Sequence, residues 1–562
     1  MIKPEFQSRR SNVLGTKASA ASNHAIATNV GLSILERDGN AADAAVAMAA
    51  TLAVVEPMSS GLGGDTFCLF YDNSTREVKG LNGSGRSGSK LTMDLVKSHG
   101  FSKSNPIPPT HGLTVNVPGA PAALFDTIEQ FGSKKFSVSQ LLEPAIDYAE
   151  NGFPVTEYTG VTWRDNMDKL TSSRFGKELL IGNRPPFVGE IMKNPSMALS
   201  LREMANHGRR GFYEGRVGDA IVREVRQAGG VLTTEDLTSH QSNLVVPIHT
   251  DYRGLRLWEA PPNGLGINAL VALNILEGFD LKALGHNSYN YMHLVIEALK
   301  LSFADTLAHV TDPAHSPISI QTLLSKNYAA KRRRLIKPDF ALNLYVPGDI
   351  SVGSDTTYAT AIDAQGNACS FITSIYEVFG SGLVPRDCGF ALNNRGLNFS
   401  LDPKHPNALG PSKRTLHTIL PAMLTDEITG DLLASFGIVG GFMQSQAHVQ
   451  MVLNMGVFGL SPQDALDAPR LFIDIPNNMS GVSSRIGPVL LEAGHPSETA
   501  KELQTRGHEV SGWVGGYERR RFGRGCIIAR GAWWTSSEAK KNGKGVLWAG
   551  ADPRGDGNAL AL

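Results

Sequence analysis

Two adjacent threonines, Thr356 and Thr357, follow a glycine–serine turn and open a stretch that reads as a β-strand. A threonine hydroxyl can attack a carbonyl group, but it is a weak nucleophile and needs a neighbouring base. β-branched residues are also common at the start of ordinary strands, and that is the more frequent reason for such a pair. The pair therefore marks a candidate nucleophile that needs support from elsewhere in the chain.

The residues that follow predict a β-hairpin that brings a second hydroxyl to this candidate. Strands are predicted at 357–362 and 368–374, joined by a turn at 363–367. If the loop has three residues, the pairing register places Ser374 opposite Thr356. Directly opposed residues have Cβ atoms about 5 Å apart, so the two hydroxyls can touch.

A second segment that could take part in chemistry is the pair Gly440–Gly441. It lies between a predicted strand at 434–439 and a predicted helix from residue 443 to 454. Backbone N–H groups at such a junction can point at a ligand, and the helix N-terminus adds partial positive charge. This combination suits an oxyanion hole. A tight strand-to-helix turn is the commoner role of an isolated glycine pair.

Other kinds of site find less support in the sequence. The glycine-rich segment 61–64 lacks the spacing of a dinucleotide or phosphate loop. The motifs H-E-x-x-H and G-x-S-x-G do not occur, and the histidines are scattered. We therefore expect no metal site and no bound cofactor.

The composition is that of a folded globular protein. The chain has 562 residues, of which 41% are hydrophobic and 19% charged, which excludes a disordered protein. A net charge of +0 gives no electrostatic reason to bind nucleic acid or an anionic membrane. The four cysteines form no C-x-x-C motif and are expected to be buried thiols. The N-terminal residues show no signal-peptide pattern and no apolar stretch is long enough to span a bilayer, so we expect a cytoplasmic protein.

The elements around these segments predict sheets covered by helices. Helical patterns dominate the first part of the chain, strands dominate beyond about residue 350, and helices then return. We find no internal repeat and no break into separately folding domains. Helices are predicted at 25–38, 41–55, 139–151, 197–206, 217–228 and 290–308, and a further strand at 66–71.

Taken in order, many short motifs resemble the γ-glutamyltransferases, and the resemblance covers nearly the whole chain. Each motif is weak alone, but so many in the same order identify the family. In the N-terminal part they are G-N-A-A-D-A-A at 39–45, G-L-G-G-D at 61–65, P-G-A-P at 118–121, G-F-Y-E-G at 211–215, G-G-V-L-T-T-E-D-L at 229–237, D-Y-R-G at 251–254 and P-P at 261–262. In the C-terminal part they are T-T at 356–357, F-G-S-G at 379–382, L-N-N at 392–394, P-N at 406–407, K-R at 413–414, G-G at 440–441 and D-P-R at 552–554.

The resemblance implies an α+β fold, the four-layer αββα sandwich of the N-terminal-nucleophile hydrolases. It also implies a proenzyme that cuts its own Asp355–Thr356 bond. The products would be a large chain, residues 1–355, and a small catalytic chain, residues 356–562, that form one intertwined domain. The implied activity is hydrolysis or transfer of γ-glutamyl or related amides, with water or an amine as the acyl acceptor.

The chemistry of the residues agrees with these implied roles. Once Thr356 is N-terminal, its α-amine, with an unperturbed pKa of about 7.7–8.0, can take the hydroxyl proton near neutral pH. The N–H groups of Gly440 and Gly441 would hold the oxyanion. Ser374, which stands where the family has threonine, would orient the nucleophile.

The departures from the family pattern concern the acyl group. The family holds the glutamyl α-carboxylate with an arginine and two serines, and the α-amine with an acid and amides. A pocket that loses the acid and gains an arginine suits an acid without a free amine. Ser84 stands at the position of the family's arginine, and Arg86 follows two residues later. His417 and Thr418 replace the two serines. Tyr376 replaces an asparagine, Arg395 replaces a glutamine, and Asn398 replaces the acid.

These features are similar to a divergent, glutathione hydrolase-like branch of the family that includes oxamate and cephalosporin-type acylases. A glutathione-like amide is the expected substrate, and an oxamate, glutaryl or cephalosporin-type amide is the alternative. A non-catalytic scaffold homologue is a further alternative. The retained Thr356, Gly440 and Gly441 argue against it.

Overall fold

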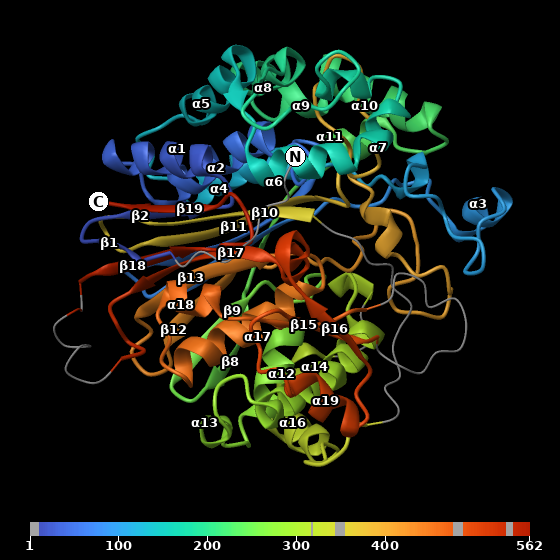
Figure 1. The fold of residues 1–562 in the computed structure, drawn as a ribbon. Coiled ribbons are helices and arrows are strands. Elements are labelled where there is room, and N and C mark those ends of the chain that lie inside the picture. The colour runs from blue at the N-terminus through green and yellow to red at the C-terminus, as the bar shows by residue number, and fades with distance from the viewer. Residues whose placement is uncertain (1–9, 316–318, 343–354, 476–486, 536–542, 544) are drawn as a thin grey trace.

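Two seven-stranded sheets pack face to face, and helices cover the outer face of each (Figure 1). This computed structural model describes residues 10–315, 319–342, 355–475, 487–535, 543 and 545–562. The arrangement is the four-layer αββα sandwich expected from the sequence, so that prediction is confirmed. No helix among these residues is long and apolar enough to span a membrane.

The first sheet carries the predicted hairpin at its centre. All of its neighbouring strands are antiparallel. In spatial order its strands are β19 (Asn558–Ala561), β2 (Ser19–Ser22), β10 (Asp355–Ile362), β11 (Ala368–Tyr376), β3 (Asp65–Asp72), β4 (Glu77–Gly83) and β7 (Asn243–Val245).

The second sheet is also antiparallel. Its order is β1 (Val13–Gly15), β18 (Leu547–Ala551), β17 (Arg524–Arg530), β13 (Leu432–Val439), β12 (Ala422–Asp426), β9 (Leu255–Glu259) and β8 (Ile248–Tyr252). Smaller sheets pair β5 (Phe153–Pro154) with β6 (Ile191–Met192), and β15 (Val489–Glu492) with β14 (Leu471–Ile473) and β16 (Val510–Val514). Both large sheets therefore combine strands from before and after residue 355.

Helices from the N-terminal half cover the first sheet, and later helices cover the second (Figure 1). The first group comprises α1 (Ala25–Glu36), α2 (Ala41–Val55), α4 (Ala120–Phe131), α5 (Val138–Asn151), α6 (Glu157–Asp165), α7 (Met167–Thr171), α8 (Pro195–His207), α9 (Arg210–Tyr213), α10 (Gly215–Gln227) and α11 (Thr234–Thr238). Helix α3 (Met93–Ser98) projects to one side of the molecule (Figure 1). The second comprises α12 (Ile267–Leu276), α13 (Leu281–Leu284), α14 (Tyr289–His309), α15 (Ile320–Leu324), α16 (Lys326–Arg333), α17 (Met443–Gly456), α18 (Pro462–Asp467) and α19 (Thr499–Thr505).

Helix α2 shows why an alanine-rich segment folds as it does here. Every residue from Ala41 to Val55 is buried, because small side chains let the helix pack closely between the sheet and the outer helices. Asn40 caps its N-terminus in a capping box with Asp43. All four cysteines are buried free thiols, as expected.

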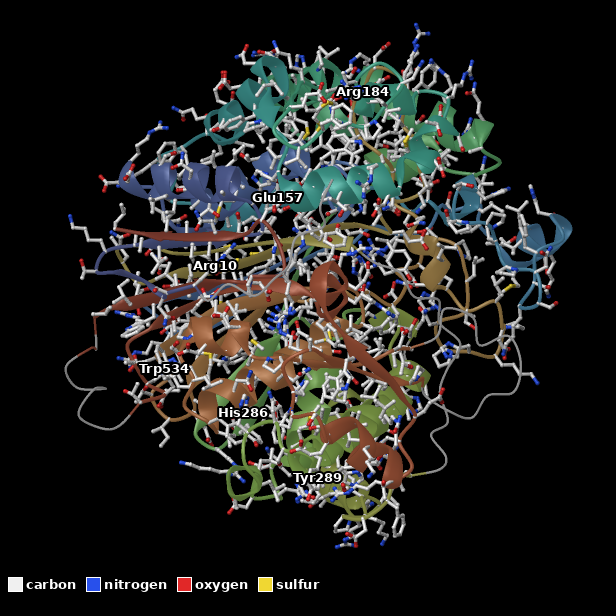
Figure 2. All side chains as sticks on the ribbon, viewed as in Figure 1. Arg10, Glu157, Arg184, His286, Tyr289 and Trp534 are labelled. Atoms are coloured by element: carbon white, nitrogen blue, oxygen red, sulfur yellow. The ribbon has the colours of Figure 1, made fainter. Side chains whose placement is uncertain are left out.

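Side chains fill the space between the two sheets (Figure 2). Successive residues of a strand point to opposite faces, so every second residue of β10 and β3 reaches this space. Phe67 and Leu69 from β3, Tyr358 from β10 and Val439 from β13 belong to one buried cluster there. The opposite set, including Cys68 and Phe70, packs against the helices.

The hairpin has the predicted register over most of its length. Thr357 pairs with Thr373, and the N–H of Asp363 donates to the carbonyl of Asn367 at 3.0 Å. A β-bulge lies between Asp355 and Thr357, so Thr356 sits where the ladder is irregular.

Candidate active site

Three polar residues lie side by side at one end of the first sheet. Ser374 of β11 pairs directly with Asp65 of β3, and Thr356 of β10 lies one residue from the pair Thr357–Thr373 on the other side of β11. Directly opposed residues point to the same face of a sheet. Asp65 shares a face with Phe67 of the inter-sheet core, so Asp65 and Ser374 face the second sheet. Thr356, Ser374 and Asp65 are all completely buried.

Strand β10 runs against β13 of the second sheet. The hydroxyls of Thr360 and Ser435 are 2.7 Å apart. Two residues further along, a Cβ atom on Gly437 would lie 2.4 Å from the ring of Tyr358. Continuing in the same direction by two more residues leads from Tyr358 to Thr356 on one side, and from Gly437 to Val439, the last residue of β13, on the other. Thr356 is therefore directed toward the turn that follows β13.

That turn is the pair Gly440–Gly441, at the start of α17. Its φ angles are 124° and 60°, a region that residues with a side chain rarely adopt. The carbonyls of Gly440 and Gly441 accept from the N–H groups of Met443 and Gln444, each at 3.1 Å, and so point toward the helix. Within the described residues, neither glycine N–H donates a hydrogen bond. Such a turn can present two N–H donors to an anion.

A second polar cluster surrounds Arg395, which begins a short 3₁₀ helix, Arg395–Asn398, and is completely buried. Its Nη1 donates to Thr418 Oγ1 at 3.3 Å. Its Nε lies 3.5 Å from Asp65 Oδ2, an ion-pair contact longer than a normal hydrogen bond. The guanidinium carbon lies 4.4 Å from the centre of the Tyr376 ring. In the part of the chain that the structure describes, Nη2 has no hydrogen-bond partner.

His417 completes this cluster as a neutral donor. Its Nε2 lies 3.0 Å from Asp65 Oδ2, and its Nδ1 accepts from the N–H of Ile419 at 3.4 Å. Burial lowers the pKa of His417 to about 4, and the positive charge of Arg395 acts in the same direction. Burial likewise lowers the pKa of Arg395 to about 10, which leaves the guanidinium charged at neutral pH.

Asp65 is the acid of the cluster. Burial acts to raise its pKa, but the hydrogen bond from His417 and the charges around it outweigh this, so the pKa lies below its usual value. Its second oxygen, Oδ1, accepts from the N–H of Gly85 at 2.6 Å. With Asp65 negative, Arg395 positive and His417 neutral, these three side chains carry no net charge.

Of the residues predicted to bind substrate, Tyr376, Arg395, His417 and Thr418 therefore meet in one place. Asn398 lies on the same helical turn as Arg395, and its Nδ2 donates to the carbonyl of Leu416 at 3.1 Å.

Arg86 is in a different position from these residues. It is half-buried, and its carbonyl accepts from the N–H of Val117 at 2.9 Å. Its charge adds to burial in lowering the pKa of Arg414 to about 10. Arg414 in turn donates to the carbonyl of Ser84 at 2.9 Å. The structure thus groups Arg86 with Arg414 and gives it no contact with Arg395.

Asp65 was absent from our list of candidate residues. The sequence does contain a signal for it. Asp65 is the first residue of a strand whose next six residues are all buried, and a charged residue is rarely buried without a partner. Its side-chain partners, Arg395 and His417, are more than three hundred residues away along the chain, so no local pattern could name them.

Comparison with known proteins finds similar proteins over nearly the whole chain. A model of the gamma-glutamyltranspeptidase family matches residues 27–562. The glutathione hydrolase-like YwrD proenzyme of Bacillus subtilis is 37% identical over 98% of this chain and 99% of its own length. The oxamate amidohydrolase proenzyme of Klebsiella pneumoniae is 30% identical over 98% of this chain and 99% of its own. The crystal structure of cephalosporin acylase from Bacillus halodurans superposes with a TM-score of 0.88 at 39% identity, covering 99% of this chain and 97% of the other. On these matches, this protein is a member of the gamma-glutamyltranspeptidase family.

Proposed function

We propose that this protein is a self-processing amidohydrolase of the glutathione hydrolase type, with Thr356 as its nucleophile. The observation that carries the proposal is the position of Thr356. It lies buried beside Ser374 at the start of β10, across from the end of β13, where the Gly440–Gly441 turn begins. The names of two relatives add support. One is an oxamate amidohydrolase proenzyme, and the other is a glutathione hydrolase-like proenzyme.

Maturation would begin with attack of the Thr356 hydroxyl on the carbonyl carbon of Asp355. The Asp355–Thr356 peptide bond breaks as an ester forms, and the nitrogen becomes the free α-amine of Thr356. Water then hydrolyses the ester and restores the hydroxyl. The products are residues 1–355 and 356–562, which stay together because both sheets contain strands of each.

Turnover would use the same hydroxyl with the new α-amine as its base. The hydroxyl attacks the substrate carbonyl, and the oxyanion is held by the N–H groups of Gly440 and Gly441. Collapse breaks the C–N bond, and the proton taken by the α-amine passes to the leaving amine. Water, or an acceptor amine, then releases the acyl group from the threonine ester. No cofactor takes part in these steps.

The acyl group is proposed to be γ-glutamyl or a related group with a carboxylate. Arg395 favours a carboxylate and repels an ammonium, and Asn398 carries no negative charge to pair with one. A glutaryl, cephalosporin-type or oxamate amide is therefore the second candidate, and its support is the buried guanidinium of Arg395. Glutathione, a glutaryl amide and oxamate should be compared by kcat/KM. A clear preference for glutathione would contradict the assignment of Arg395.

A denaturing gel of the purified protein tests self-processing. Two bands are expected, and N-terminal sequencing of the smaller should begin at Thr356. A single band that hydrolyses none of the three substrates would support the inactive scaffold instead. A small chain that begins at another residue would contradict Thr356 as the nucleophile.

A further inference from the structure

Asp65 and Arg395 form a charge pair at a place where neither charge can be screened by solvent. Asp65 opens β3 and is completely buried, and Arg395 is completely buried at the start of the 3₁₀ helix. Asp65 lies on the same sheet face as Ser374, one strand from it, and β10 with Thr356 is the next strand. Neighbouring strands are about 4.8 Å apart, so an acyl group held on Thr356 extends within reach of this pair.

The polar atoms of Asp65 and Arg395 differ in whether they have hydrogen-bond or ion-pair partners. Both oxygens of Asp65 are occupied, Oδ1 by the N–H of Gly85 and Oδ2 by His417 and the guanidinium of Arg395. Arg395 keeps the edge formed by Nε and Nη2 without a hydrogen-bond partner among the described residues, although Nε lies within ion-pair distance of Asp65. A buried guanidinium edge without a partner is unfavourable, and a carboxylate is the group that matches it best. The pocket thus offers a donor to an anion, while the charge of its acid is already neutralised by Arg395.

We propose that Asp65 is a specificity-determining residue, which acts by neutralising and positioning Arg395, so that the balance of this one charge pair decides which acyl groups the enzyme accepts. The inference rests on the proposed function, since it takes Thr356 as the atom that carries the acyl group. It goes beyond that function because it assigns a role to an acid that the sequence analysis named only as part of a motif.

Removing the charge of Asp65 should shift selectivity toward substrates with a carboxylate. Removing the charge of Arg395 should shift it toward substrates with an ammonium. Asp65→Asn leaves the guanidinium without its fixed counter-ion, so a substrate carboxylate becomes its only buried partner. Arg395→Gln leaves the carboxylate of Asp65 uncompensated, so a substrate ammonium becomes favourable there. Breaking one partner of a buried pair has large effects because the remaining charge is poorly solvated. Loss of packing alone would weaken all substrates together.

The test uses three anilides with acyl chains of equal length. Glutaryl ends in a carboxylate, 5-aminopentanoyl in an ammonium, and pentanoyl is uncharged. Each charged substrate is expressed as the ratio of its kcat/KM to that of pentanoyl, for the mature wild type, Asp65→Asn, Arg395→Gln and the double variant. Arg86 and Arg414 are unchanged in every variant, so their charges cancel in these comparisons.

The expected result is a crossing pattern. Asp65→Asn should raise the glutaryl ratio, and Arg395→Gln should lower it while raising the 5-aminopentanoyl ratio, each by about tenfold or more. The double variant should fall between the single ones. Arg184→Gln is a matched control, because it breaks an Arg–Glu pair with Glu190 in the outer helical layer (Figure 2), where the arginine side chain is 42% exposed. It should leave both ratios unchanged.

Failure of this inference is distinguishable from failure of the proposed function. If no anilide is hydrolysed by a wild type that is correctly folded, the proposed function is wrong. If pentanoyl is hydrolysed but the variants shift both charged ratios in the same direction or not at all, the charge pair does not set specificity. If Asp65→Asn does not mature, Arg395→Lys supplies the comparison. It keeps the charge and should retain the glutaryl preference that Arg395→Gln loses, and equal ratios for the two would overturn the proposal.

Discussion

The guanidinium of Arg524 binds both carboxylate oxygens of Glu56, at 3.1 Å and 2.6 Å, and stacks on the ring of Tyr158 at 3.9 Å from its centre. Glu56 ends α2, and Arg524 pairs with Val439, the last strand residue before the Gly440–Gly441 turn. The segment from Glu56 to Asp65 is therefore held at each end by a buried ion pair with a residue beyond position 355. The first pair, Glu56–Arg524, adjoins the strand residue that precedes the glycine turn, and the second is the pair Asp65–Arg395.

Replacing one member of the Glu56–Arg524 pair should destabilise the protein strongly. Glu56→Gln leaves a buried guanidinium without its counter-ion, which costs about 3–5 kcal/mol. The measurement is the shift in the midpoint of denaturant unfolding. Glu150→Gln is the matched control, because it removes a carboxylate that binds Arg202 through both oxygens at an exposed site, where solvent screens the charges and the shift should be much smaller. Equal shifts for the two variants would show that the buried pair contributes nothing special.

Processing should depend on the hydroxyl of Thr356 and not on that of its neighbour. Thr356→Ala should give one uncut chain, whereas Thr356→Ser keeps a hydroxyl and should still be cut. Thr357→Ala is the control, since Thr357 points to the other face and donates to the carbonyl of Thr373 at 3.4 Å. Denaturing gels over time would show this. Normal cutting of Thr356→Ala would remove Thr356 from the mechanism.

A side chain in the glycine turn should reduce turnover more than it reduces stability. Gly441 has φ 60°, so Gly441→Ala strains the backbone that carries the proposed N–H donors. Loss of one such donor lowers kcat by about 10²–10³-fold. Gly254→Ala is the control, because Gly254 has φ 86° with open space at its Cβ, and only the conformational cost of about 1–2 kcal/mol applies. Full turnover of a mature Gly441→Ala enzyme would contradict the oxyanion assignment.

Stability should fall steeply as the pH drops from about 6.5 to 4. Five buried histidines are held neutral, since burial lowers the pKa of His24, His417 and His495 to about 4, of His240 to about 3 and of His508 to about 2. In the unfolded chain a histidine has a pKa of about 6.5, so below that pH the unfolded state binds more protons and is favoured. Each such group contributes a slope of about 1.4 kcal/mol per pH unit.

Unfolding midpoints at several pH values would measure this slope. His495→Gln should make the dependence shallower, because it removes one of the buried groups. His207→Gln is the control, since the His207 side chain is 64% exposed on α8. A stability that is constant between pH 6.5 and 4.5 would contradict the neutral state of the buried histidines.

The bounds of a helix or strand were predictable where neighbouring residues in the sequence determine them. The helix predicted at 41–55 has those bounds in the structure, because alanine favours a helix and Asn40 and Glu56-Pro57 delimit it. The helix predicted at 25–38 ends at Glu36 instead, and Asp38 adopts φ 62°. The strand predicted from residue 357 begins at Asp355, because that residue pairs with Tyr376 beyond the bulge.

The candidate site was predictable only in part. The hairpin register follows from one loop length, so Ser374 could be placed next to Thr356 from the sequence. The residues around Arg395 were named through family resemblance, but their contacts depend on how β3, β11 and the segment around His417 come together. A single sequence carries no information on that pairing. The acid that neutralises Arg395 therefore appeared only in the folded chain.

The position of β10 between β2 and β11 has a consequence for how such a protein can be made. A precursor that is cut before Thr356 must have built its sheet first, because the strands on either side of the new chain end belong to different pieces. Residues 1–355 expressed alone would have an unfilled gap between β2 and β3, with open edges that invite aggregation. The cut then acts as a checkpoint for correct folding. Mixing residues 1–355 and 356–562 after separate expression should not reconstitute the enzyme. The strands of the two chains are expected to pair correctly only when they fold as one continuous precursor.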